Sequence, residues 1–146
     1  MTVTLITPNT QHQQLRIPMF AEAVSAGFPS PAQDYVEQEL DLNQLCIKHP
    51  CATYFVRVQG DSMQDAGIHP GDILVVDRSL QPLHGQIVIA GFHGELTVKR
   101  LELVPRVRLV PCNHNYPPLE IPEGSELEVM GVVTHAVRNI LAGGVA

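Results

Sequence analysis

From residue 52 onward, apolar and β-branched residues occur in short runs that Gly, Pro and Asn separate. Each run is shorter than an average helix, and the breaks between runs hold residues typical of turns. The runs predict strands over 53–58, 73–76, 86–90, 95–103, 107–110 and 127–138. Strands at this spacing, with no helical pattern between them, favour a compact, mostly antiparallel β structure over α/β winding.

The turns between these strands have recognisable sequences. His69-Pro-Gly-Asp72 and Leu83-His-Gly85 combine residues that favour tight turns. Gly91-Phe-His-Gly94 lies between two strand patterns, and it predicts a short hairpin loop.

The first part of the chain has a different pattern. Residues 1–29 are polar at first and then mildly apolar, without a period that would sustain a long helix. We interpret them as a flexible N-terminal arm. They are too few for a helix-turn-helix domain, which excludes a DNA-reading head of the usual repressor type.

A helix is predicted over residues 31–46. Ser30 can cap it, Pro31 suits its first turn, and Gln33 can complete a capping box, while Pro50 prevents continuation. Its candidate buried residues are Tyr35, Val36, Leu40, Leu42 and Leu45. The predicted organisation is therefore an arm over 1–29 and a β-rich domain with one N-terminal helix over 30–146.

Composition sets limits on function. The 146 residues suit one domain with its own core, and the net charge is −6 with only two lysines, Lys48 and Lys99. This balance argues against a surface that grips the phosphate backbone of DNA. No run of 18 apolar residues occurs, so we expect no membrane segment. Three cysteines without the spacing of a disulfide framework favour a cytoplasmic protein.

Cysteines and histidines do not predict a metal centre or a cofactor site. Cys46, Cys51 and Cys112 are odd in number and lack Cys-x-x-Cys spacing. The closest approaches to a ligand pair are His49-Pro-Cys51 and Cys112-Asn-His114, and both are weak. We expect neither a metal nor a cofactor.

Ser62 is a candidate nucleophile because Gly60-Asp61-Ser62-Met63 directly follows a predicted strand. The same serine also matches Ser-x-x-Asp with Asp65, the signature of a helix N-terminus. Taken alone, the capping interpretation is the stronger of the two. A serine nucleophile needs a base beside it.

Lys99 is the candidate base. Alternation within the strand places Lys99 on one face with Thr97 and Leu101, whereas Arg100 lies on the other face. A lysine among apolar residues loses hydration of its charge, so its pKa falls and the neutral amine becomes available. The alternative is an edge-strand lysine that discourages aggregation.

Five motifs in the same order strengthen the catalytic interpretation. Together they closely resemble the UmuD branch of the LexA-like self-cleaving Ser/Lys peptidases, over roughly residues 20–140. The motifs are Ala26-Gly27-Phe28-Pro29-Ser30-Pro31, the segment Tyr35 to Leu45, Gly60-Asp61-Ser62-Met63, the segment Gly71 to Asp77, and Leu96-Thr97-Val98-Lys99-Arg100.

The resemblance implies a LexA-like catalytic β domain and assigns roles to residues. Ser62 is the nucleophile, Lys99 the base, Ala26-Gly27 the cleaved bond, and the backbone amides of Asp61 and Ser62 the oxyanion hole. It further implies a homodimer, stimulation by the RecA filament on single-stranded DNA after damage, and a shortened product that joins a UmuC-type translesion polymerase. Ala before the cleaved Gly is the LexA-like choice.

Local chemistry agrees with that cleavage site. Val24 and Ala26 are small, Gly27 has no side chain, and Pro29 biases Phe28 toward an extended conformation. The alternative from another class is a polymerase-accessory or scaffold module without catalysis, in which Ser62 is a cap and Lys99 a solvated charge.

Overall fold

The computed structural model describes residues 2–6, 14–20 and 36–141. The chain divides into two compact units. The first unit combines Met1–Pro8 with His49–Ala146, and the second is Asn9–Lys48. Each unit is described below by itself.

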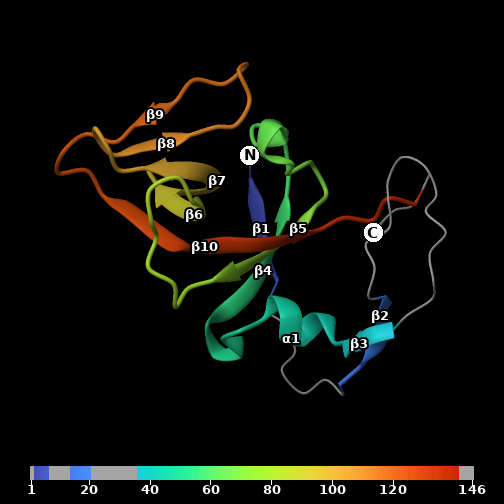
Figure 1. The fold of residues 1–146 in the computed structure, drawn as a ribbon. Helices are drawn as coiled ribbons and strands as arrows, with labels where there is room; N and C mark the ends of the chain where they lie inside the picture. Colours follow the sequence, from blue (N-terminus) through green and yellow to red (C-terminus); the bar gives the residue numbers. More distant parts are fainter. Residues whose placement is uncertain (1, 7–13, 21–35, 142–146) are drawn as a thin grey trace. The chain divides into compact units, whose positions relative to one another are not determined.

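The first unit is a single eight-stranded antiparallel sheet, which confirms the mostly β fold class. The strands run in the order β1-β4-β5-β10-β6-β7-β8-β9, and the long β10 joins the two halves of the sheet (Figure 1). The bounds are β1 Val3–Ile6, β4 Thr53–Val58, β5 Ile73–Asp77, β6 Ile87–Phe92, β7 Glu95–Glu102, β8 Arg108–Val110, β9 Leu119–Glu120 and β10 Leu127–Val137. Short 3-10 turns are η1 Pro50–Ala52 and η2 Gln64–Ala66.

Every strand predicted from residue 52 onward is present. The strand predicted over 53–58 matches β4 residue for residue, and the others agree to within a few residues at each end. The predicted hairpin loop joins β6 to β7 through His93 and Gly94, whose φ angles of 52° and 77° are both positive. Positive φ at both central positions is the signature of the tight hairpin turn that suits the twist of the flanking strands.

The second unit corrects the predicted helix over 31–46. Val36–Leu40 form a strand, β3, which pairs with β2 (Ile17–Phe20), and only Leu42–Cys46 form the helix α1. Its cap is Asp41, whose side chain accepts a hydrogen bond of 2.9 Å from the Asn43 amide. The start signal at Ser30 lies outside the described residues.

Two of the residues expected in the buried face of that helix are exposed. Leu42 is 63% exposed and Leu45 is 42% exposed, so the prediction of their burial is wrong. The reason is that the strand pairing of residues 36–40 ends at Asp41, which leaves a helix of five residues. A helix this short has no continuous stripe to bury.

Two segments of the predicted N-terminal arm form short strands that the sequence analysis did not predict. Residues 3–6 form β1 at one edge of the eight-stranded sheet, and residues 17–20 form β2. Each segment is four residues long, too short to show a period in the sequence, and a tertiary partner strand determines its conformation.

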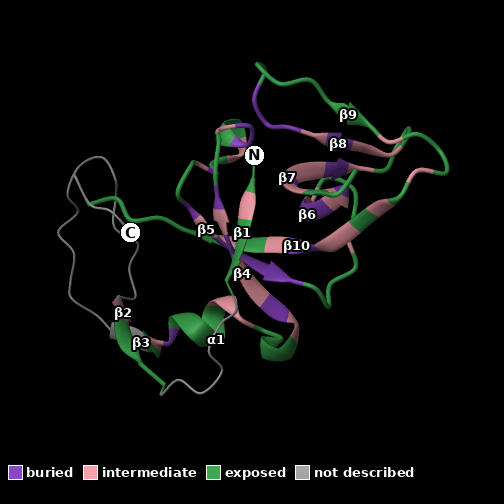
Figure 2. Ribbon diagram, turned by 180° about the vertical axis from the view of Figure 1, so that it is seen from behind, coloured by how far each residue is buried: buried purple, intermediate pink, exposed green. Residues whose placement is uncertain are grey.

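The core of the first unit lies along β4, β5, β6 and β7 (Figure 2). One cluster includes Val56, Val58, Met63 and Val98, and a second cluster forms around Leu109 and its neighbours. Met63 directly follows Ser62, so the first cluster fixes the chain beside the candidate nucleophile.

An ion pair with a buried carboxylate holds the segment after Met63. Asp72 is fully buried, and its carboxylate accepts hydrogen bonds of 2.7 Å from both Nε and a terminal nitrogen of Arg138. Burial alone would raise the pKa of Asp72, but the bonds from Arg138 and from the His69 amide outweigh it and lower the pKa. The pair therefore ties the end of β10 to the turn before β5.

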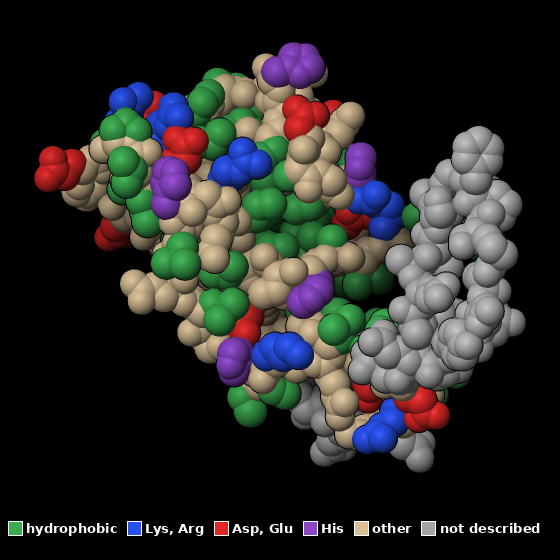
Figure 3. Space-filling view, viewed as in Figure 1, with side chains coloured by type: hydrophobic (Ala, Val, Ile, Leu, Met, Phe, Trp, Pro, Cys, Tyr) green, Lys and Arg blue, Asp and Glu red, His purple; other side chains and the backbone are tan. Residues whose placement is uncertain are grey.

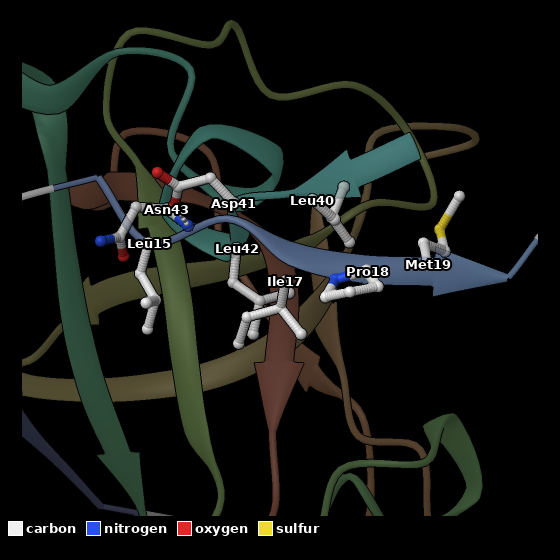
Figure 4. Close-up of a pocket in the computed structure, with 8 residues that line it drawn as sticks. All are labelled: Leu15, Ile17, Pro18, Met19, Leu40, Asp41, Leu42 and Asn43. Carbon is white, nitrogen blue, oxygen red and sulfur yellow. Dashed lines mark hydrogen bonds between the residues drawn. The ribbon is translucent and has the colours of Figure 1, made fainter. Parts of the chain in front are cut away.

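Apolar side chains line a groove in the second unit (Figure 4). Leu15, Ile17 and Leu42 lie close together on one side of β2. All three are more than half exposed within the described residues.

Gly131 supplies a test of this packing, because β10 changes register with β6 between Val129 and Gly131. Gly131 has φ +155°, and a Cβ there would lie 2.6 Å from Cγ1 of Val76. Gly131→Ala should therefore lower the free energy of unfolding by about 1–3 kcal/mol, measured by urea denaturation. Gly91→Ala is the control, since its Cβ meets the nearest side-chain atom at 3.6 Å. Equal losses in the two variants would contradict the packing argument.

Candidate active site

Ser62 lies in the turn that follows β4. Gly60 adopts φ 83°, a left-handed conformation that glycine accepts without strain, and it turns the chain out of the strand. Ser62 is 2% exposed and is followed by the fully buried Met63. The serine is thus held at a fixed position where the sheet gives way to η2.

Lys99 lies on β7, between β6 and β8, so it is not on an edge strand. Its Nζ is 3.1 Å from Oγ of Ser62. Nζ also donates to Oγ1 of Thr97 at 2.8 Å and to the carbonyl of Val98 at 3.1 Å. The structure therefore brings the predicted serine and lysine within hydrogen-bond distance.

These contacts rule out both of the non-catalytic interpretations of the two residues. The N-cap position of η2 is Met63, and no side chain caps it, so Ser62 is not a capping residue. The part-buried hydrogen bonds of Lys99 and its place on an interior strand exclude a solvated edge charge.

The three contacts of Nζ can serve either protonation state of the Lys99 amine. A charged ammonium would donate all three of its hydrogens, whereas a neutral amine has two hydrogens and one lone pair. Thr97 and the Val98 carbonyl can take the two hydrogens. The lone pair is then directed to the hydroxyl of Ser62, as a base requires.

Burial favours that neutral state. Desolvation lowers the pKa of Lys99 from its ordinary value of 10.5, against a smaller opposing influence of Cys112. Burial in turn raises the pKa of the Cys112 thiol above its ordinary value of 9.0. Because the thiol is neutral near pH 7, its opposing charge is absent there, and desolvation alone sets the direction in which the pKa of Lys99 shifts.

The segment after β8 holds the turn that contains Ser62, the serine turn, through backbone hydrogen bonds that together form a brace. The Cys112 amide donates to the Ser62 carbonyl at 2.8 Å, and the Asp65 amide donates to the Cys112 carbonyl at 2.7 Å. β8 is itself paired with β7, the strand of Lys99. Serine and lysine are therefore connected through a short path of hydrogen bonds.

Two side chains add to this brace, and sequence reasoning missed both. Asn113 is buried and donates from Nδ2 to the Asp61 carbonyl at 2.9 Å. The Tyr116 hydroxyl donates to Oδ1 of Asp61 at 2.6 Å. The only sequence signal is the cluster of turn residues after the predicted strand 107–110, which does not identify the partner.

The backbone amides of Asp61 and Ser62 are available for an oxyanion. In residues 2–6, 14–20 and 36–141, neither N–H donates a hydrogen bond. The Asp61 carbonyl points opposite to the Ser62 N–H in the same trans peptide group, and Asn113 holds that carbonyl, so the brace orients the Ser62 amide. Ala26 and Gly27 lie outside the described residues.

No group of three or more His, Cys, Asp or Glu side chains in the described segments could hold a metal ion.

A serine beside a part-buried lysine amine, carried on a curled β sheet, is the arrangement of the Ser/Lys class of serine peptidases. Comparison with known proteins agrees: residues 18–134 match the family model described as Peptidase S24-like. The chain belongs to the Peptidase S24-like family. It is a UmuD-like, self-cleaving serine peptidase of the SOS mutagenesis type.

Individual relatives cover most of the chain. Protein SamA of Salmonella typhimurium is 54% identical over 130 residues, which are 89% of this chain and 91% of SamA. Protein MucA of Escherichia coli is 55% identical over 122 residues, covering 83% of this chain and 84% of MucA. The LexA repressor of Shewanella halifaxensis is 36% identical over 139 residues, covering 94% of this chain and 66% of the repressor.

The state of Lys99 can be tested by pH. The rate of self-cleavage should rise with pH and level off below the ordinary lysine pKa of 10.5, because burial lowers the pKa of Lys99. Lys99→Arg and Lys99→Met should both stop cleavage, since neither offers a neutral amine. Rates are measured as loss of intact chain by mass spectrometry. Undiminished cleavage in Lys99→Arg would exclude Lys99 as the base.

The same lowered pKa predicts a change in stability. Below pH 10.5 the unfolded chain holds the Lys99 proton more tightly than the folded chain does, so the parent is destabilised relative to Lys99→Met. The difference in unfolding free energy should be largest at low pH and shrink as the pH rises toward 10.5. Lys48→Met, at an exposed lysine, is the control for the removal of one lysine from the chain. A difference that does not depend on pH would contradict the assignment.

Proposed function

We propose that this protein cuts its own Ala26-Gly27 bond, with Ser62 as nucleophile and Lys99 as general base. The observation that supports this most directly is the 3.1 Å separation of Nζ and Oγ in a part-buried setting. The backbone amides of Asp61 and Ser62 would stabilise the negative charge on the Ala26 carbonyl oxygen. This function divides the chain into an arm over 1–29 that carries the bond and a peptidase domain over 30–146.

The reaction follows from the geometry in two stages. Oγ of Ser62 attacks the carbonyl carbon of Ala26 while Nζ of Lys99 takes the hydroxyl proton. The tetrahedral intermediate collapses, the C–N bond breaks, and Lys99 passes its proton to the departing amine of Gly27. Water, deprotonated by Lys99, then hydrolyses the ester between Ala26 and Ser62 and frees residues 1–26.

Thr97 acts as a positioning residue in this scheme. Its hydroxyl accepts one hydrogen of the Lys99 amine at 2.8 Å, and the Val98 carbonyl accepts a second. With two hydrogens engaged, the lone pair of the neutral amine has one direction left, toward Ser62.

We infer that this cleavage takes place in the cytoplasm after DNA damage and is stimulated by RecA filaments on single-stranded DNA. The product, as a homodimer, would be an accessory subunit of a UmuC-type error-prone translesion polymerase. The family and the UmuD-like relatives support this inference. No helix in the described parts of the chain is long and apolar enough to cross a membrane.

The distribution of charge fits recruitment by proteins more than a direct grip on DNA. On the face shown in Figure 3, Lys and Arg side chains of the described residues are scattered among acidic and apolar ones. The net charge of −6 acts in the same direction, because binding to the phosphate backbone relies on clustered cations.

Cleavage predicts a defined change in size. Incubation at alkaline pH, or with RecA filaments on single-stranded DNA, should convert the chain to residues 27–146 with Gly27 as the new N-terminus. Intact-mass measurement over time detects the product. A cut at another bond would contradict the site, and a chain that stays intact under both conditions would favour the non-catalytic accessory module.

Ser62→Ala should abolish cleavage and leave the fold in place. The change removes one hydroxyl in a buried position, so it should alter the unfolding free energy by no more than about 1–2 kcal/mol. Ser79→Ala is a matched control, because its hydroxyl also makes a part-buried hydrogen bond, to Asp77, away from Lys99. Cleavage at the same bond in Ser62→Ala would show that another residue is the nucleophile.

A further inference from the structure

The strand β1 closes one edge of the eight-stranded sheet. It pairs antiparallel with β4, with Val3 opposite Val58, Thr4 opposite Arg57, and Ile6 opposite Phe55. β1 is the last strand on its side of the sheet order. It therefore occupies the edge that β4 would otherwise present to solvent.

Hydrogen bonds define which β4 amides depend on β1. The Gln59 amide donates to the Thr2 carbonyl at 3.0 Å, whereas the Val58 amide donates to the Asp72 carbonyl at 2.9 Å, on the β5 side. Amides along an antiparallel strand alternate between its two neighbours. Phe55, Arg57 and Gln59 therefore bond toward β1, and Val56 and Val58 bond toward β5.

Little apolar burial holds β1 in place. Leu5 is 55% exposed, Ile6 is 36% exposed, and Val3 is only partly buried against the core. The strand is four residues long. Its attachment therefore relies on backbone bonds and on the covalent chain, which keeps its effective concentration high.

The proposed cleavage breaks that covalent connection. Residues 1–26 contain β1 and also β2, which pairs with β3 in the second unit. A two-stranded pair is marginally stable by itself in water, so β2 does not retain the excised segment once the chain is cut. The loss of residues 1–26 removes the partner of β4.

We propose that self-cleavage opens the edge of β4 and turns it into a docking site for an extended segment of a partner protein. The proposal rests on the proposed function, because the cut must fall between β1 and β4. An edge strand with free amides and carbonyls is a template for an added strand. The uncut chain would carry its own inhibitor of this site, in the form of β1.

The charge on β4 indicates the chemistry of the partner. Arg57 is the only charged residue of the strand and makes no ion pair among the described residues. β1 places the neutral Thr4 opposite it. A second β4 also offers no acidic residue. The best occupant is therefore a partner strand with apolar residues and an Asp or Glu opposite Arg57, since opposite charges across a strand pair attract.

Hydrogen exchange tests the opening of the edge. The chain is first allowed to cut itself, which mass spectrometry confirms, and gel filtration then separates the product from residues 1–26. In this product the amides of Phe55, Arg57 and Gln59 should lose protection in NMR-detected hydrogen exchange. The amides of Val56 and Val58 should keep theirs, which separates edge opening from general destabilisation. Protection of all five in a product without residues 1–26 would show self-pairing of β4 edges and overturn the proposal. Retention of residues 1–26 on the product would overturn it as well.

Peptides test the occupant. A fluorescent peptide with the sequence of residues 2–6 and Thr4→Glu should bind the cut chain at least about tenfold more tightly than the uncut Ser62→Ala chain, since β1 competes intramolecularly. The same peptide with Thr4→Lys should bind the cut chain more weakly than the Glu peptide, because it faces Arg57. Equal binding of both peptides, or of the Glu peptide to both chains, would refute the docking site.

A matched pair of proline variants opens the edge without a cut. Thr4 faces Arg57 in a hydrogen-bonded pair, so Thr4→Pro in the Ser62→Ala chain should release β1 and permit binding of the Glu peptide. The amide of Leu5 points away from β4, so Leu5→Pro should leave the edge closed. Equal binding of the Glu peptide to the two variants would contradict the proposed pattern of hydrogen bonds by which β1 blocks the edge of β4.

A last experiment distinguishes failure of this proposal from failure of the proposed function. A Ser62→Ala chain with a recognition sequence for an added site-specific protease, inserted after residue 26, is cut without its own chemistry. If this cut frees the Phe55 and Arg57 amides, the edge proposal stands even where self-cleavage fails. If the cut leaves them protected, the edge proposal fails whatever the outcome for self-cleavage.

Discussion

The hydrogen bond between the Lys99 amine and the Ser62 hydroxyl is the contact on which the proposed chemistry of this protein depends. It requires a lysine that is removed from water, because a solvated lysine would keep its proton near pH 7. The sheet provides that environment by placing Lys99 on an interior strand. There the Thr97 hydroxyl and the Val98 carbonyl accept hydrogen bonds from the Lys99 amine in place of water. Removal from water opposes folding, so the site is maintained at the expense of stability.

The remainder of the first unit supplies that stability and the geometry. Apolar side chains of β4, β5, β6 and β7 form the buried core, and Met63 anchors the serine turn within it. The Asp72–Arg138 pair holds the segment that follows the turn. Serine and lysine are thus positioned by packing that does not itself take part in catalysis.

Much of this could be predicted from the sequence, for physical reasons that differ between features. The strands after residue 52 are evident because β-branched runs alternate with turn residues, and alternation within 95–103 places Thr97 beside Lys99. The helix predicted over 31–46 is wrong because a capping signal is local, whereas the pairing of Val36–Leu40 with β2 is tertiary. The bonds of Asn113 and Tyr116 to Asp61 could not be predicted, since they join residues more than 50 positions apart without a local signature.

The brace between the Cys112 segment and the serine turn has a consequence for evolution. Serine and lysine are connected most directly through Cys112, β8 and β7, not through the 36 residues that separate them along the chain. Residues 80–83, between β5 and β6, lie at the surface away from this path. Descendants of this sequence can therefore gain or lose residues within 80–83 and keep Oγ of Ser62 close to Nζ of Lys99. One deletion between Val110 and Asn113 would instead move these two atoms apart.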